Sequence, residues 1–267
     1  ISYRLVGSEM CIRDRLCFEM GIALNPTIHL PIHCWKFEAP RGGYIQRVRV
    51  GRPLKELEMK TKVLFLASSP RNHALLSTDA EHRDAFDKKL LTEAVHRDRF
   101  EVATHHALLA EDFQSTLRRE RPQVLHFSGH GTRTGELVFE RRGRTSTERL
   151  SKDVAFSMIA KAVSIASARQ KISLAVINAC HSAELAQLLV ENGVEVAIGM
   201  EVAIADDSAI AFARAFYHAL GDGDSVQQAY DQAIIDGSFA DVHTSGSGRP
   251  RLFMAAGVDA SQITLHD

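Results

Sequence analysis

Cysteine is scarce in this chain and unevenly placed. Four cysteines occur among 267 residues, at positions 11, 17, 34 and 180, so Cys180 stands alone after the first 34 residues. A disulfide scaffold needs several cysteines distributed over the fold, and this distribution argues against one. We therefore expect a reducing compartment, the cytoplasm, and a free thiol at Cys180.

Net charge and long apolar segments are also lacking. The formal net charge is −1, and the isoelectric point near 7.0 gives no bulk attraction to nucleic acid or to an anionic membrane. No run reaches the roughly 18 apolar residues that a membrane span needs. The start of the sequence shows no secretory signal pattern. We expect no direct nucleic-acid partner and no membrane partner.

Motifs for several other chemistries are missing. There is no Gly-x-Ser-x-Gly elbow, which weakens the alternative of a small-molecule α/β hydrolase. The stretch from Ser128 to Thr132 lacks the Gly-Lys-Ser/Thr element of a phosphate-binding loop. A zinc site made of His126, His130, Cys180 and His181 would lack the paired close spacings of metal motifs. We expect neither a metal nor a cofactor.

The first 60 residues show little regular pattern. Residues 1–15 resemble translated sequencing-adaptor read-through, in which case they are not native. From residue 16 to about 60 several prolines interrupt the chain, and only residues 44–50 alternate like an exposed strand. This part is predicted to be an upstream fragment or a linker, followed by a regular domain over residues 61–267.

From residue 61 onward, short apolar runs alternate with segments of helical periodicity. The runs cover residues 62–67, 124–128, 174–178 and 194–200, and helical segments lie between them. Continuously apolar strands are typical of a parallel sheet that is buried on both faces. The pattern predicts an α/β fold with a mostly parallel central sheet and helices on both faces, which is a three-layer αβα architecture.

Some local boundaries follow from the same pattern. Residues 78–98 are expected to form one amphipathic helix whose apolar side includes Phe86, Leu90 and Val95. Ser151 is expected to cap a helix that has Asp153 in its first turn. A later helix is expected over residues 207–220, ended by Gly221.

Two of the apolar runs end in small residues and one reactive side chain. The first run ends at His130, between two glycines, and the second ends at Cys180. Ligands bind beyond the carboxyl ends of strands in open α/β sheets, so these side chains are predicted to meet at one rim. An imidazole can take the proton of a thiol and later protonate a leaving group. We interpret Cys180 as a nucleophile, His130 as its general base and acid, and the Gly131 and Cys180 amides as oxyanion donors.

The residues around this pair resemble a known family. His126-Phe127-Ser128-Gly129-His130-Gly131 and Val176-Ile177-Asn178-Ala179-Cys180-His181-Ser182 are similar to the two active-site boxes of the CHAT domain. This is a caspase-like cysteine peptidase family related to caspases and separase, and the similarity extends over about residues 61–257. It implies a caspase–haemoglobinase fold and the roles given above. It also implies a regulated effector, in bacterial defence or programmed cell death, that is held inactive until a sensor or partner protein acts.

The resemblance also bears on substrate preference. Separase-like relatives bind a basic P1 residue through an acidic side chain on the loop after the strand that follows the cysteine strand. Asp206 stands at that place, with Asp207 as its neighbour, which implies a preference for Arg or Lys at P1. In an alternative interpretation, Asp207 or Ser208 caps the next helix. Some other branches use an acidic residue two positions before the nucleophile, where this chain has Asn178.

Two functional classes stay open, and one histidine is set aside. His126 faces away from Phe127 along its strand and is predicted to be a packed or hydrogen-bonded structural residue. The leading hypothesis is a cysteine endopeptidase that cleaves a protein or peptide substrate through a thioester. The alternative is a catalytically idle module that uses the CHAT fold for docking. It predicts no labelling of Cys180 by peptide-based thiol-reactive probes.

Overall fold

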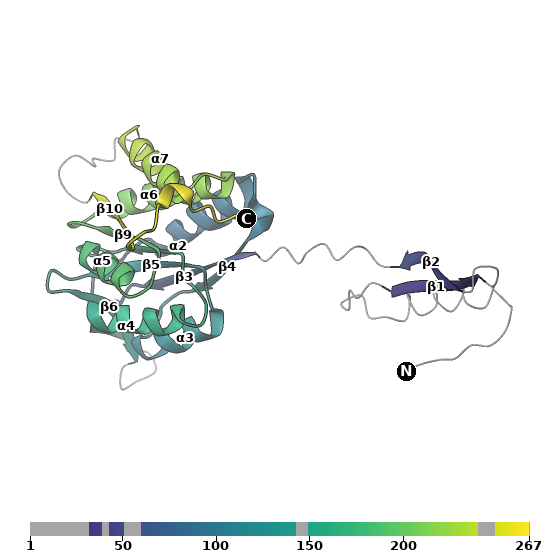
Figure 1. The fold of residues 1–267 in the computed structure, drawn as a ribbon. Coiled ribbons are helices and arrows are strands. Elements are labelled where there is room, and N and C mark those ends of the chain that lie inside the picture. Colours follow the sequence, from purple (N-terminus) through teal and green to yellow (C-terminus); the bar gives the residue numbers. More distant parts are fainter. Residues whose placement is uncertain (1–31, 39–42, 51–59, 143–148, 240–248, 267) are drawn as a thin grey trace. The chain divides into compact units, whose positions relative to one another are not determined.

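A computed structural model describes residues 32–38, 43–50, 60–142, 149–239 and 249–266 (Figure 1). The chain divides into two compact units, Ile1–Met59 and Lys60–Asp267. In the first unit, strands β1 (Ile32–Glu38) and β2 (Gly43–Val50) form an antiparallel pair. The sequence predicted β2 and missed β1. Residues 1–15, which resemble read-through, lie outside the described part.

The second unit is organised around a sheet with the strand order β10-β9-β8-β5-β3-β4 (Figure 1). Neighbouring strands from β9 to β4 are parallel, and β10 is antiparallel to β9. The strands are β3 (Thr61–Ser68), β4 (Phe100–His105), β5 (Val124–Gly131), β8 (Leu174–Asn178), β9 (Val196–Met200) and β10 (Pro250–Met254).

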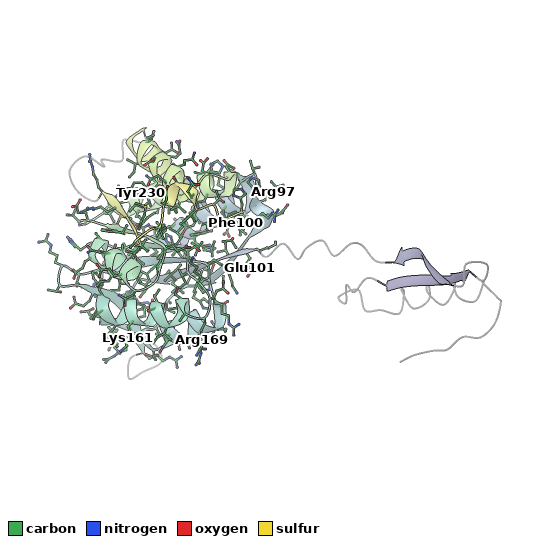
Figure 2. The ribbon with its side chains drawn as sticks, viewed as in Figure 1. Arg97, Phe100, Glu101, Lys161, Arg169 and Tyr230 are labelled. Carbon is green, nitrogen blue, oxygen red and sulfur yellow. The ribbon has the colours of Figure 1, made fainter. Side chains whose placement is uncertain are left out.

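Helices cover both faces of this sheet. One face carries α2 (Thr78–Glu81), η2 (His82–Glu93), α6 (Asp206–Asp222) and α7 (Val226–Phe239). The other carries α3 (Phe113–Glu120), α4 (Phe156–Ser167) and α5 (Ala183–Glu191). Figure 2 shows Tyr230 of α7 and Lys161 of α4 in the opposite outer layers. The predicted three-layer α/β fold with a mostly parallel sheet is confirmed and is consistent with a caspase-like fold.

The apolar runs explain why the sheet lies in the middle. Along β3, Val63 and Phe65 pack into the cluster on the α6 face, whereas Leu64 and Leu66 pack into the cluster on the α4 face. All four are at most 1% exposed. Because successive strand residues point to opposite faces, only an unbroken apolar run fills both clusters. Burying each such side chain contributes about 1.5–3 kcal/mol.

A hairpin extends the rim of the sheet beyond β5. Strand β6 (Glu136–Arg142) pairs antiparallel with β7 (Arg149–Ala155). The start of β6 also pairs antiparallel with the end of β5. Ser151 and Asp153 lie within β7, so the predicted helix cap at Ser151 is wrong. Helix α4 begins at Phe156, and the backbone pairing of β7 with β6 outweighs the local capping preference of Ser151.

The helix after β3 also differs from its prediction. Glu93 ends η2, which is a π-helix with hydrogen bonds such as Ala94 N–H to the Lys89 carbonyl. These i→i+5 bonds change the spacing of the later apolar positions. Phe86 and Leu90 are buried as expected, whereas Val95 lies beyond the helix and is 69% exposed.

Helix α6 continues past its predicted end. Gly221 lies within α6, and the left-handed residue that ends the helix is Gly223, with φ of +105°. A Cβ atom at Gly221 would lie 2.5 Å from the Ala94 Cβ. The glycine therefore permits close packing of α6 against η2 rather than ending the helix.

We predict that Gly199→Ala destabilises the second unit. A Cβ atom at Gly199 of β9 would lie 2.5 Å from the carbonyl oxygen of Ser182. Ser182 is held by its hydroxyl, which donates to the Ile177 carbonyl and accepts from the Met200 N–H, so it cannot move away easily. Overpacking of this kind costs about 1–3 kcal/mol. Urea denaturation should show the loss, and an unchanged midpoint would contradict this close approach.

Candidate active site

The register of β5 against β8 brings the two sequence boxes to one rim. The strands are parallel, and their register runs from Val124 opposite Leu174 to Ser128 opposite Asn178. His130 lies two residues after Ser128 on β5, and Cys180 lies two residues after Asn178. After β3, the chain adds β4 on one side of it and then crosses over to add β5 on the other side. The strand order therefore reverses between β3 and β5, next to this rim. Such switch points are where open α/β sheets bind ligands.

The two boxes are in direct backbone contact at Gly131. A Cβ atom at this position would overlap the Cys180 carbonyl oxygen and lie 3.1 Å from the carbonyl carbon. No residue with a side chain fits at this approach, so glycine is required. The predicted oxyanion donors, the Gly131 and Cys180 amides, belong to residues that the fold brings together.

His130 is oriented by a backbone carbonyl. Its Nε2 atom lies 2.8 Å from the carbonyl oxygen of Ala74, in the segment between β3 and α2. A carbonyl can only accept, so Nε2 carries the proton, and in the neutral ring the lone pair is on Nδ1. A base held by a third group is the arrangement expected beside an activated nucleophile.

The surroundings keep the His130 imidazole neutral. Burial lowers its pKa from the ordinary value of 6.5, and the positive charge of a protonated His73 lowers it further. The hydrogen bond to Ala74 and the negative charge of Asp206 act in the opposite direction, but the lowering effects prevail. The rings of His73 and His130 have centroids 5.3 Å apart. The ring is therefore in its basic form at neutral pH.

Cys180 is a free, partly buried thiol in the turn after β8. Its Sγ atom lies 4.0 Å from the carbonyl oxygen of Ile204 in a weak contact. Among the hydrogen bonds of the described residues, none joins this thiol to His130. Catalytic hydrogen bonds are often long in enzymes without substrate, so the missing bond does not argue against a pairing of Cys180 with His130.

The residue after the cysteine has an unusual backbone. His181 has φ of +57°, a left-handed conformation that is uncommon for residues other than glycine. Its N–H donates to the Val202 carbonyl at 3.4 Å, and the buried Ser182 that follows is hydrogen-bonded to both β8 and β9. These contacts hold the sharp turn that carries the partly buried Cys180 at the rim.

Asp206 lies at the same rim as His130. It is the first residue of α6, and its Oδ2 atom accepts a hydrogen bond of 2.9 Å from the Ser77 N–H. Its charge acts on the His130 ring, as described above. Asp207 is exposed. No side-chain cap closes the start of α6, where Ala205 is the N-cap, so the alternative of a cap by Asp207 or Ser208 is wrong.

A buried polar cluster lies on the strands that precede His130 and Cys180, and the sequence interpretation found only part of it. His126 is fully buried, with Nδ1 3.1 Å from the Tyr217 hydroxyl and Nε2 3.0 Å from a carboxylate oxygen of Glu81. This confirms His126 as a packed, hydrogen-bonded residue. Glu81 was missed, because a lone glutamate among charged helical residues is typical of an exposed surface.

Two further searches concern the described part of the chain only. No three His, Cys, Asp or Glu side chains gather there as candidate metal ligands. No helix there has the length and apolar character needed to cross a membrane.

Comparison with known proteins places the chain in a family. The model of the CHAT domain matches residues 49–237. A probable protease of Gillisia limnaea is 27% identical over 161 residues, which cover 60% of this chain and 27% of the relative. The pyridoxal kinase of Staphylococcus aureus, solved with pyridoxal, matches 73% of this chain and 99% of its own at 9% identity and a TM-score of 0.35. The family match covers well over half of the sequence and includes both boxes, so the chain belongs to the CHAT domain family.

Proposed function

We propose that this chain is a cysteine endopeptidase domain that uses Cys180 as nucleophile and His130 as general base and acid. The observation that carries the proposal is the imidazole at the rim, whose Nε2–H is held by Ala74 and whose Nδ1 is left as the base. Membership of the CHAT domain family and similarity to a protein named probable protease support it. A regulatory partner protein and a cytoplasmic location belong to the same proposal.

The proposed reaction has two stages. In the first, the Cys180 thiol gives its proton to His130 Nδ1, and the thiolate attacks the scissile carbonyl carbon. The amides of Gly131 and Cys180 stabilise the oxyanion. The C–N bond then breaks, and the leaving amine takes the proton from His130, which leaves a thioester. In the second stage, His130 takes a proton from water while the water oxygen attacks the thioester carbonyl carbon. The C–S bond then breaks, His130 returns the proton to the Cys180 sulfur, and the carboxylic acid product leaves.

The groups around His130 suit this cycle. The ring must be neutral at the start, and burial favours the neutral form. It becomes an imidazolium during catalysis, and the Ala74 carbonyl and the Asp206 carboxylate then stabilise the positive charge. Burial gives the His130 pKa its net downward direction, and the Ala74 carbonyl and the Asp206 carboxylate oppose it.

We predict that Cys180→Ala and His130→Ala each abolish proteolysis. Loss of the nucleophile leaves no thioester route, and loss of the general base lowers kcat/KM by at least about 100-fold. Proteome-wide cleavage-site profiling of the wild type and of both variants measures both effects, with a sample that lacks the protein as the background. His218→Ala, on the half-exposed surface of α6, is the matched control and should cleave like the wild type.

Retained cleavage in either active-site variant would refute the assignment of the dyad. A second candidate function is a catalytically idle docking module, which needs no thiol–imidazole hydrogen bond, and none is found among the described residues. It predicts that peptide-based thiol-reactive probes leave Cys180 unlabelled. Covalent labelling of Cys180 in the wild type, lost in His130→Ala, would exclude this module.

Asp206 is proposed to favour Arg or Lys at P1. Its carboxylate lies at the rim beside His130, so a basic side chain next to the scissile bond is within reach of a charged partner. We predict that Asp206→Asn lowers kcat/KM for substrates with Arg at P1 by about tenfold or more, because hydrogen bonds to charged groups are the stronger class. Asp207→Asn, at the exposed neighbour, should have little effect. A peptide library cleaved equally after neutral residues would count against this preference.

The pH dependence of cleavage should respond oppositely to two substitutions. Asp206 raises the pKa of His130, so Asp206→Asn should move the acid limb of the kcat/KM profile to lower pH. Protonated His73 lowers the same pKa, so His73→Asn should move that limb to higher pH. The limb reports the thiol and imidazole as a pair. A substrate with a neutral P1 residue separates this effect from P1 binding, and shifts in the same direction would disprove the assignment.

A further inference from the structure

A single carboxylate joins the two catalytic strands just beneath the rim. Glu81 is the last residue of α2, and it is only 3% exposed. Its Oε1 accepts a hydrogen bond of 2.5 Å from Asn178 Nδ2, and its Oε2 accepts one of 2.5 Å from the Ser128 hydroxyl. His126 Nε2 lies 3.0 Å from Oε1.

The two strand partners of Glu81 occupy a special place in the sheet. Ser128 and Asn178 are opposite one another in the β5–β8 register, and no later pair is in register. His130 and Cys180 follow them by two residues each. Glu81 therefore spans β5 and β8 at the last level where the sheet itself fixes their spacing. Catalytic groups displaced by about 1 Å can lose about 100-fold in rate.

The donors of this cluster form hydrogen-bond chains that end at the carboxylate. Ser128 and Asn178 donate to it through a hydroxyl and an amide, and neither of these bonds can be reversed while Glu81 is ionised. The Tyr217 hydroxyl donates to His126 Nδ1, which leaves His126 Nε2–H to donate to Glu81. Burial and the Glu81 charge raise the pKa of Tyr217, so its hydroxyl keeps the proton that this chain requires.

The cluster also fixes the orientation of Asn178. Its Nδ2 atom donates both to Glu81 and, at 3.1 Å, to the carbonyl of Ala209 in α6. A flipped amide would place its oxygen against two acceptors, which is unfavourable. Glu81 thus connects α2 with β5 and β8, and through Asn178 it also connects these elements to the helix that carries Asp206.

We propose that Glu81 is a positioning residue that sets the separation of His130 and Cys180 through its hydrogen bonds to Ser128 and Asn178. This inference deepens the proposed function and rests on it. Glu81 lies under the sheet rim and does not touch the reacting atoms. Its effect on the reaction is therefore transmitted through the strands, and it is visible as a change in thiol reactivity.

The test measures how fast iodoacetamide alkylates Cys180 as a function of pH, followed by mass spectrometry of the Cys180 peptide in the full chain. A thiol paired with an imidazole stays reactive below the pH at which a free thiol does. We expect Glu81→Ala to lower the alkylation rate at pH 6 by about tenfold or more, to the level of His130→Ala.

Glu81→Gln should restore most of the rate, to within about threefold of the wild type. A glutamine side chain has the same shape, and its oxygen can still accept from Asn178 and His126. Its amide can donate to Ser128, whose hydroxyl rotates to act as acceptor. A glutamine variant as slow as the alanine variant would overturn the role of the hydrogen-bond geometry.

The matched control is Ser225→Ala, which removes buried hydrogen bonds to Gln228 at the start of α7. This region lies at the opposite end of the strands. The Val226 N–H donates to the Ile263 carbonyl, and two residues later the Leu265 carbonyl accepts from the hydroxyl of Thr61, the first residue of β3. We expect Ser225→Ala to lower the free energy of unfolding and to leave the pH profile of Cys180 alkylation unchanged. If Glu81→Ala does not fold, Ser128→Ala removes one arm of the bridge and should give a partial loss.

The outcomes separate the two proposals. If His130→Ala alkylates like the wild type, the dyad itself is wrong, and the positioning role is overturned with it. If His130→Ala is slow but Glu81→Ala and Ser128→Ala are as fast as the wild type, the dyad stands and the positioning role alone is overturned.

Discussion

The parallel register of β5 with β8 is the constraint on which the site depends. It aligns Ser128 with Asn178, and thereby brings the ends of two segments 50 residues apart to the same level. The backbone contact between Gly131 and Cys180 follows from this alignment. A register shift of one residue would turn the polar side chains of β5 to the opposite face. The apolar side chains on both sides of the sheet, which fill two separate clusters, prevent such a shift.

The face of β5 that carries the site is polar, whereas the other face is apolar. Leu125 and Phe127 belong to the cluster beneath α4, and His126 points to the opposite side, against Glu81 and Tyr217. A carboxylate without partners in this position would be strongly destabilising, because the desolvation of an ion costs several kcal/mol. Hydrogen bonds from His126 and Ser128 of β5 and from Asn178 of β8 offset that cost. The same bonds that make the buried charge tolerable also hold the strands together at the rim.

Local patterns predicted most of the fold and the position of His130 and Cys180 at neighbouring strand ends. The strands were predictable because an apolar run filling two clusters can hardly be anything else, and His130 and Cys180 because both follow such runs. Other features depend on distant contacts. The Ala74 carbonyl that orients His130 is backbone and has no residue signature. Glu81 resembles a surface residue until α2 is packed under β5 and β8. Ser151 has a good capping side chain, but its backbone is paired in a strand.

The hydrogen bond of His130 to a backbone carbonyl rather than to a carboxylate has a chemical consequence. A carboxylate in that position would titrate and would carry its own charge into the site, whereas the Ala74 carbonyl keeps the same dipole at every pH. Charge reaches the imidazole instead from Asp206 and from His73, which act in opposite directions. The orientation of the ring and the tuning of its proton affinity are thus carried by different groups. If Asp206 binds a basic substrate side chain, as proposed, that pairing would weaken the attraction between its carboxylate and a protonated His130, and would thereby favour proton transfer from His130 to the leaving amine.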